Sequence, residues 1–452
     1  MSISPVDSSV YGGLFTTPAM RAVFADEARL QRMLDVEAAL ARAQARLGLI
    51  PAAAAKEISA KAEIARFDLA EIGRGTELVG YPIVPLVKAF SRACTGEAGR
   101  YVHWGATTQD IIDTALVLQL RDALELIRQD LDGTKAALAE LARRHRDTPM
   151  AGRTHAQHAL PITFGFKCAL WLDPLKRHSE RLERIRREIA VVQFGGAVGT
   201  LASLGTDGIR VMEALAEELG LGTPPIAWHV ARDRLAEVVS FLGLLTGSLG
   251  KIATDVALLM QAEIGEVAEP YQEGRGGSST MPQKRNPIAC EFVLACARNV
   301  RQLVPVMLDA MVQDHERATG PWHAEWVALP QTFALTAGAL HHARAMLEGL
   351  QVDPARMRRN LATTRGMISA EAVMMALARA VGREEAHHLV AAACQRALAA
   401  DRHLLDELQV DAAITAHLPP ERLAALLDPA NYTGLAGEFV DRVLARAATP
   451  SD

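Results

Sequence analysis

The sequence predicts an all-α protein of three domains arranged around a long central helical bundle, and three observations support this prediction. Alanine and leucine outnumber valine, isoleucine and tyrosine, and aromatic residues make up only 5% of the chain, a composition that favours helices over sheets. Two long segments carry apolar residues at alternating spacings of three and four, as amphipathic helices do. The 452 residues are enough for about three domains of roughly 150 residues each.

Residues 1–112 are expected to form a compact N-terminal helical domain. Helical stretches alternate there with glycine- and proline-containing turns at residues 12–13, 48–51, 80–82 and 96–99. The C-terminal residues 352–452 also contain short segments, interrupted at 419–420 and 429–437, and are expected to form a smaller helical domain.

The central domain, residues 113–351, carries the two long periodic segments. In the first, the apolar positions are Leu120, Leu124, Ile127, Leu131, Leu138 and Leu141, and only Thr134 interrupts them. In the second, between residues 225 and 270, they are Leu235, Val238, Leu242, Leu245, Leu249, Ile252, Val256 and Leu259. A helix of roughly 35 residues there would span about 50 Å. Leu244 and Leu258 add apolar surface outside this seam, so we expect a homo-oligomer whose subunits cover the remaining faces.

The charge and cysteine content exclude several classes of protein. A net charge of -5 without long like-charged blocks argues against nucleic-acid and membrane partners and favours a small molecule. The five cysteines are scattered without a Cys-x-x-Cys pair, and the N-terminus lacks the pattern of an export signal, so a cytoplasmic location is expected. His155 and His158 are too sparse to form a metal site, and no metal is expected.

The glycine-rich segment at residues 274–287, GRGGSSTMPQKRNP, is the first candidate for a functional site. Its glycines give the backbone freedom to move, and Lys284 supplies a cation. Asn286 is expected to cap a helix that begins at Pro287, where free amide groups favour anions. A carboxylate substrate fits this loop, with Ser278 as its proton-transfer residue; a flexible linker is the alternative.

Two further segments contain histidines beside threonines. In GRTHAQH (152–158), His155 follows Thr154. Histidine suits acid–base chemistry near neutral pH, but a structural role is the more common one for a lone histidine. In YVHWGATTQD (101–110), Thr107 and Thr108 open a helix and could hold a carboxylate. An ordinary helix cap is the alternative, and it leaves His103 unassigned. The block at residues 313–326 places four charged or titratable residues near two tryptophans: His315, Arg317, His323 and Glu325. It could form a wall of the active site that sets substrate specificity, or it could be a capped helix junction.

These three segments, GSSTMPQKRNP, GRTHAQ and HWGATTQD, resemble the signature regions of the fumarase/aspartase superfamily, in the same order and across essentially the whole chain. Within it, the chain is most similar to the bacterial 3-carboxy-cis,cis-muconate cycloisomerases, and adenylosuccinate lyases are better-known relatives. The resemblance implies a three-domain helical subunit, a homotetramer, and active sites that three subunits share.

The resemblance also implies roles for individual residues. Ser278 would transfer the proton at the carbon next to a carboxylate, and Lys284 and Asn286 would bind substrate. His155 would pair with Glu291, and His103 matches the histidine of the first region. Thr107, Thr108 and Thr154 match carboxylate-holding hydroxyls.

The implied reaction is the lactonisation of 3-carboxy-cis,cis-muconate to 4-carboxymuconolactone, in the protocatechuate branch of the beta-ketoadipate pathway, without a cofactor. The substrate's own carboxylate adds to the double bond while Ser278 protonates the neighbouring carbon, and a carboxylate needs no base to attack.

The presence of His155 and Glu291 gives weight to an alternative, a C–N lyase that releases fumarate from a succinylated amine. The first twenty residues contain no arginine or lysine, which argues against a substrate that carries a nucleotide phosphate. A catalytically silent structural protein is a third hypothesis, against which the intact loop argues.

Overall fold

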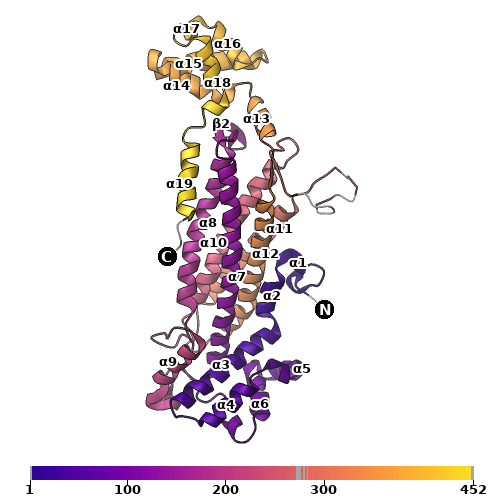
Figure 1. Ribbon diagram of the computed structural model, residues 1–452, viewed down its shortest axis with the longest axis vertical. Helices are drawn as coiled ribbons and strands as arrows, with labels where there is room; N and C mark the ends of the chain where they lie inside the picture. The colour runs from indigo at the N-terminus through magenta and orange to yellow at the C-terminus, as the bar shows by residue number, and fades with distance from the viewer. Residues whose placement is uncertain (1–2, 271–275, 278–279, 282, 449–452) are drawn as a thin grey trace.

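A computed structural model describes residues 3–270, 276–277, 280–281 and 283–448. It is an elongated, mostly helical molecule whose five long helices run side by side along its length (Figure 1). These helices are α7 (Thr108–Arg144), α8 (Phe164–Ile189), α10 (Asp233–Leu259), α11 (Ile288–Asp309) and α12 (Pro321–Glu348). The all-α prediction is confirmed.

The short helices gather mainly at the two ends of this bundle (Figure 1). Those before it are α1 (Gly12–Phe15), α2 (Pro18–Phe24), α3 (Asp26–Arg46), α4 (Ala52–Lys61), α5 (Leu69–Val79) and α6 (Ile83–Ala93), and α9 (Gly208–Leu219) lies at the same end. Those after it are α13 (Pro354–Ala362), α14 (Ala370–Val381), α15 (Arg383–Ala399), α16 (Leu404–Val410), α17 (Ala412–Thr415), α18 (Pro420–Leu427) and α19 (Ala436–Ala448). Helices α14 to α18 enclose a separate apolar core, whereas α19 returns to pack against α8.

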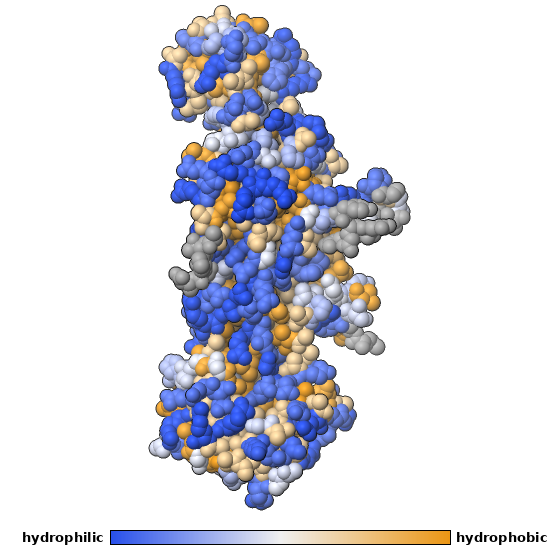
Figure 2. Space-filling view, in the orientation of Figure 1, coloured by the Kyte–Doolittle hydropathy of each residue, from blue (hydrophilic) through white to orange (hydrophobic). Residues whose placement is uncertain are grey.

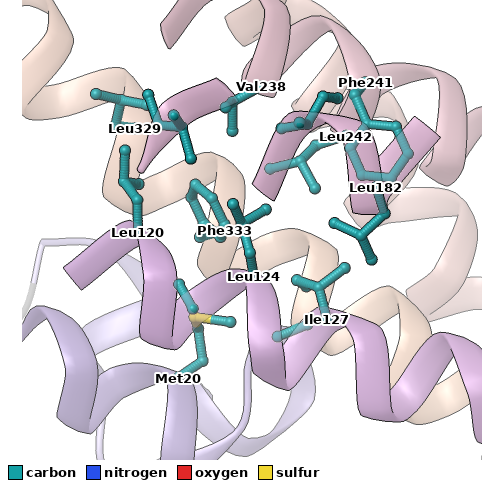
Figure 3. Close-up of a cluster of buried hydrophobic side chains, with 14 of the residues drawn as sticks. Met20, Leu120, Leu124, Ile127, Leu182, Val238, Phe241, Leu242, Leu329 and Phe333 are labelled. Atoms are coloured by element: carbon teal, nitrogen blue, oxygen red, sulfur yellow. The ribbon is translucent and has the colours of Figure 1, made fainter. Parts of the chain in front are cut away.

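Helix α7 forms where the first apolar seam predicted it. Its six seam residues are all buried, and at about 1.5–3 kcal/mol for each large aliphatic side chain their burial is a strong driving force. Thr134, which interrupts the apolar pattern, is also buried, and its hydroxyl donates to the Asp130 carbonyl at 2.7 Å. The interruption is therefore a core position whose polar group is satisfied within the helix. Leu120, Leu124 and Ile127 meet residues of α10 and α12 in the bundle core (Figure 3).

Helix α10 is shorter than expected, with 27 residues instead of roughly 35. Residues 225–232 form a loop, in which Trp228 and Arg232 are buried and hydrogen-bonded. These side-chain contacts fix a non-helical backbone that apolar periodicity does not reveal. By length and composition α10 could cross a membrane, but 67% of its most apolar stretch is buried inside the bundle.

Apolar surface remains exposed along the bundle, as Figure 2 shows on one face. Leu244 and Leu258 of α10, which the sequence placed outside the seam, are 57% and 48% exposed. The large exposed side chains Leu170, Val306, Leu308 and Val327 lie on other bundle helices.

Two small antiparallel sheets, a β-hairpin and a pair of strands far apart in sequence, complete the described part of the chain. The first pairs β1 (Pro149–Thr154) with β2 (Gln157–Thr163), and the second pairs β3 (Val267–Ala268) with β4 (Gln351–Val352). The sequence did not predict either of them. Both lie toward the end of the bundle from which the C-terminal helices extend.

Candidate active site

The first signature region lies where α7 begins. Thr107 is the N-cap residue of α7 and forms a capping box with Asp110, whose carboxylate accepts from the Thr107 amide at 3.0 Å. The capping interpretation of this segment is therefore confirmed. The Thr107 hydroxyl oxygen also accepts a hydrogen bond from Nη1 of Arg317 at 3.1 Å, and Thr108 is the first residue of the helix. A hydroxyl, an arginine and a helix N-terminus suit a carboxylate ligand.

His103 lies in the preceding loop and is held by Glu37 of α3. One carboxylate oxygen of Glu37 lies 2.6 Å from Nδ1 of His103, and the other accepts from the His103 backbone amide at 3.0 Å. Burial by itself lowers the pKa of His103, but the charge and hydrogen bond of Glu37, with a contribution from Asp110, raise it above its ordinary value. His103 is therefore an oriented imidazole with increased proton affinity.

Sequence reasoning missed Glu37, although the sequence carries a signal for it. Leu30, Met33, Glu37, Leu40 and Gln44 share one buried face of α3. Glu37 and Gln44 are the polar members of this face, and both bind the loop of the first region, because the Gln44 side chain donates to the Trp104 carbonyl at 2.7 Å. Polar residues at apolar helix positions thus mark the support of the site.

The block at residues 313–326 lies against the first region of the same chain. Arg317 joins Thr107 to the Ala197 carbonyl, which accepts from Nη2 at 2.9 Å. Behind it, Trp322 donates from Nε1 to Asp113 at 3.1 Å. Asp113 also accepts two hydrogen bonds from Arg232.

Arg232 in turn donates to Glu325, and these three charged side chains are fully buried. Burial raises the pKa of Glu325, against the opposing effect of Arg232. This network fixes the beginning of α12 to α7 and so orients Arg317 and its neighbours. Of the two interpretations of this block, a specificity wall or a helix junction, the contacts of Trp322 and Glu325 favour the junction, while Arg317 reaches the first region.

The second signature region forms the turn of the β1–β2 hairpin. Thr154 pairs with Gln157, and the two residues between them, His155 and Ala156, have φ angles of 51° and 62°. Positive φ at both positions is the geometry of type I′ turns, which favour glycine and asparagine, so this backbone is strained. Thr154 and His155 are exposed. Strain at an exposed histidine points to function rather than to packing.

The third region is described only in part, and Ser278 and Gly274 lie outside the described residues. Lys284 is exposed, and the Asn286 amide donates to the Gly276 carbonyl at 3.0 Å. The prediction that Asn286 caps the following helix from Pro287 is wrong. Helix α11 begins at Ile288, and its first amides, those of Ala289 and Cys290, donate to Glu269 at 3.0 and 2.9 Å.

A charged carboxylate is the stronger acceptor for helix amides, and it occupies the anion site that we expected there to be free. Glu291 lies on the first turn of α11 and is exposed. Among the residues that the structure describes, no hydrogen bond joins it to His155.

Within one chain, the first region lies far from the second region and from the described residues of the third. Helix α7 has 37 residues and is therefore about 55 Å long; the first region lies at its beginning, and β1 follows shortly after its end (Figure 1). The third region lies toward the hairpin end, because Arg153 of β1 forms two hydrogen bonds with Glu266, at 2.9 and 2.7 Å, just before β3. His103, Thr107 and Thr108 are thus at one end, and Thr154, His155 and Glu291 toward the other.

Comparison with known proteins agrees with this fold. A family model described as lyase matches residues 13–302, and one described as adenylosuccinate lyase C-terminus matches residues 366–443. The chain therefore belongs to the fumarase/aspartase superfamily of lyases.

Individual relatives resemble the chain along its whole length. A 3-carboxy-cis,cis-muconate cycloisomerase of Pseudomonas aeruginosa is 52% identical over 441 residues, which cover 97% of this chain and 96% of the relative. Trans-aconitate decarboxylase 1 of Mycosarcoma maydis is 48% identical over 96% of this chain and 88% of the relative. The crystal structure of 3-carboxy-cis,cis-muconate lactonizing enzyme from Pseudomonas putida matches with a TM-score of 0.93 and 48% identity, over 97% of this chain and 99% of that one.

Proposed function

We propose that this protein is a cycloisomerase that converts 3-carboxy-cis,cis-muconate to 4-carboxymuconolactone. The observation that carries this proposal is the 52% identity to the Pseudomonas aeruginosa cycloisomerase over nearly the full length of both chains. The charge pattern fits a substrate with several carboxylates, since the α7 N-terminus and Lys284 lie in signature regions and Arg317 donates a hydrogen bond to Thr107 of the first region.

The reaction needs only a few groups. A carboxylate oxygen of the substrate attacks one carbon of a double bond, and the adjacent carbon takes a proton. The lactone therefore has the atoms of the ionised substrate plus this proton and one negative charge fewer, and the proton donor is reprotonated from solvent. Ser278 delivers this proton, and the nearby cation Lys284 stabilises negative charge on its oxygen and on the substrate. Asn286 binds substrate, Thr107, Thr108 and Thr154 hold its carboxylates, and His103 adds a positive charge that Glu37 supports.

The active site is proposed to form between subunits of a homotetramer in the cytoplasm. Signature regions at opposite ends of a bundle about 55 Å long come together when neighbouring bundles pack antiparallel. The exposed side chains Leu244 and Leu258 would be buried in this arrangement. We also propose the three domains 1–112, 113–351 and 352–452 as the units of this subunit, with α19 as an arm on the central bundle.

A direct assay tests the proposed reaction. Purified protein is incubated with 3-carboxy-cis,cis-muconate, and we expect loss of diene absorbance together with lactone signals in the NMR spectrum. Ser278→Ala should lower kcat by a factor of about 10² to 10⁴, because it removes the proton donor. Trans-aconitate serves as a second substrate, with CO₂ release as the readout, since a 48% identical relative is named for its decarboxylation. An inert diene would contradict the proposal.

A C–N lyase is the second candidate, and the presence of His155 and Glu291 in the second and third regions favours it. An amine leaving group needs an acid, as a carboxylate does not. Fumarate release from a succinylated amine, with the diene unchanged, would establish this alternative.

A further inference from the structure

A cavity beside the β1–β2 hairpin contains a lysine that the proposed reaction does not use. The cavity has a volume of about 560 Å³ and lies between the hairpin and helices α8 and α10. Thr154, one of the proposed carboxylate-holding residues, lines it together with Lys167. Lys167 lies in the first turn of α8, which begins at Phe164.

The other charged side chains that line this cavity have partners. Arg153 forms two hydrogen bonds with Glu266, and Nζ of Lys251 lies 2.6 Å from Oδ1 of Asp255. The second oxygen of Asp255 accepts from Nε1 of Trp171 at 2.9 Å. These pairs leave one lining cation to be balanced.

Lys167 is that cation. Across the described ranges it forms no hydrogen bond or ion pair, and its ammonium lies 6.0 Å from the centre of the Trp171 ring. Burial lowers the pKa of Lys167 below its ordinary value. The charges of Asp255 and Glu266 raise it, those of Lys251 and Arg153 lower it, and the lowering effects prevail. The N-terminus of a long helix also disfavours a cation and favours an anion. A partly buried ammonium in this setting is costly unless a negative charge joins it.

The rest of the cavity suits a molecule with a hydrocarbon body. Phe166, Leu170 and Ile252 line it beside the polar groups. An unsaturated polycarboxylate combines apolar carbons with negative charges, as these surroundings require. An inorganic anion would leave the apolar walls without a partner.

We propose that Lys167 binds a carboxylate of the substrate, the one that does not take part in ring closure, while Thr154 in the same cavity holds the neighbouring part of the molecule. This inference rests on the proposed function for the identity of the substrate, and it makes Lys167 a specificity residue for tricarboxylates over dicarboxylates. A carboxylate of a second copy of the chain could supply the same chemistry, and the experiment separates the two sources.

Binding is measured by calorimetry on the full-length protein with tricarballylate, a saturated tricarboxylate, and with glutarate, a dicarboxylate. Lys167→Met should weaken tricarballylate binding by a factor of about 10 to 100, the usual effect of losing a hydrogen bond to a charged group. Lys167→Arg should restore most of the affinity, and glutarate binding should change little. Lys251→Met is the matched control, because Lys251 lines the same cavity but is paired with Asp255.

Kinetics with the tricarboxylate diene provide a second readout. We expect Lys167→Met to raise KM by a similar factor with kcat nearly unchanged, since the bound carboxylate does not react. Circular dichroism checks folding, and Lys167→Gln replaces the methionine variant if the latter does not fold.

Equal tricarballylate affinity of the wild type and the methionine variant would overturn the proposal, as would a wild type that does not bind tricarballylate. A variant that dissociates into smaller assemblies by light scattering, with unchanged affinity per chain, would instead assign the carboxylate to a second copy. The protein could also bind tricarballylate through Lys167 and yet leave the diene unchanged. That result would refute the proposed function but support the proposed carboxylate site at Lys167.

Discussion

His103 depends on Glu37 for both its position and its charge. The same buried carboxylate holds the backbone amide and the ring of His103, so the loop and its imidazole are fixed together. His103 has a positive φ of 63°, an uncommon conformation for a histidine. Glu37 offsets this cost with two charge-assisted hydrogen bonds.

Glu37→Gln should lower the pKa of His103, because it removes the negative charge that raises it. A raised pKa in the folded protein stabilises it below the ordinary histidine pKa of about 6.5, and this stability is lost as the pH rises through the folded value. The difference in urea midpoint between wild type and variant should therefore be larger at about pH 6 than at about pH 9. A difference that does not change with pH would show that Glu37 acts only as a hydrogen-bond acceptor.

Single residues of the site were predictable where chemistry and motif coincide, as at Thr107, whose cap geometry is confirmed. Glu37 and Arg317 were missed as supporting residues because their partners, His103 and Thr107, are 66 and 210 positions away in sequence. Contacts of such long range depend on how the helices pack, and local patterns do not contain that information.

Helices and turns differ in how far the sequence determines them. Helix α7 follows from its apolar seam, since burial of that seam favours one packed face. The start of α11 does not follow from local sequence. Its first amides donate to Glu269, which is about twenty residues earlier in the chain, rather than to a side chain at the N-cap position. The β1–β2 turn was also missed, since His155 and Ala156 are poor residues for the φ angles they adopt.

Ala156→Gly should stabilise the protein by about 0.5–1 kcal/mol, because glycine adopts a positive φ without steric cost and this gain exceeds its added freedom in the unfolded chain. Ala159→Gly, in strand β2 at a position without a positive φ, is the matched control and should destabilise by about 0.5–1 kcal/mol. Thermal unfolding of both variants measures the difference. Equal destabilisation by the two substitutions would show that the turn is not strained.

The whole molecule separates its functional regions along its length. Apolar periodicity predicted the long bundle, and Leu244 and Leu258 predicted faces that stay exposed in one chain. The same periodicity could not show that residues 225–232 leave the helix, since polar contacts of Arg232 and Trp228 decide it. In the proposed tetramer, association of bundles is the step that joins the ends.

Shared active sites make a prediction about mixtures of inactive variants. His103→Ala changes the first region, and Ser278→Ala changes the third. Suppose that different subunits of a tetramer supply these two regions. When equal amounts of the two variants mix at random, a site receives an intact first region with a probability of about one half and an intact third region with the same probability, so about a quarter of the sites are intact. The two variants, unfolded and refolded together, should therefore regain up to that fraction of wild-type activity, whereas each variant refolded alone should stay inactive. Native mass spectrometry confirms that mixed assemblies form. Mixed assemblies without activity would mean that one chain supplies both regions. The first and third regions of that chain would then have to come together across the length of α7, about 55 Å.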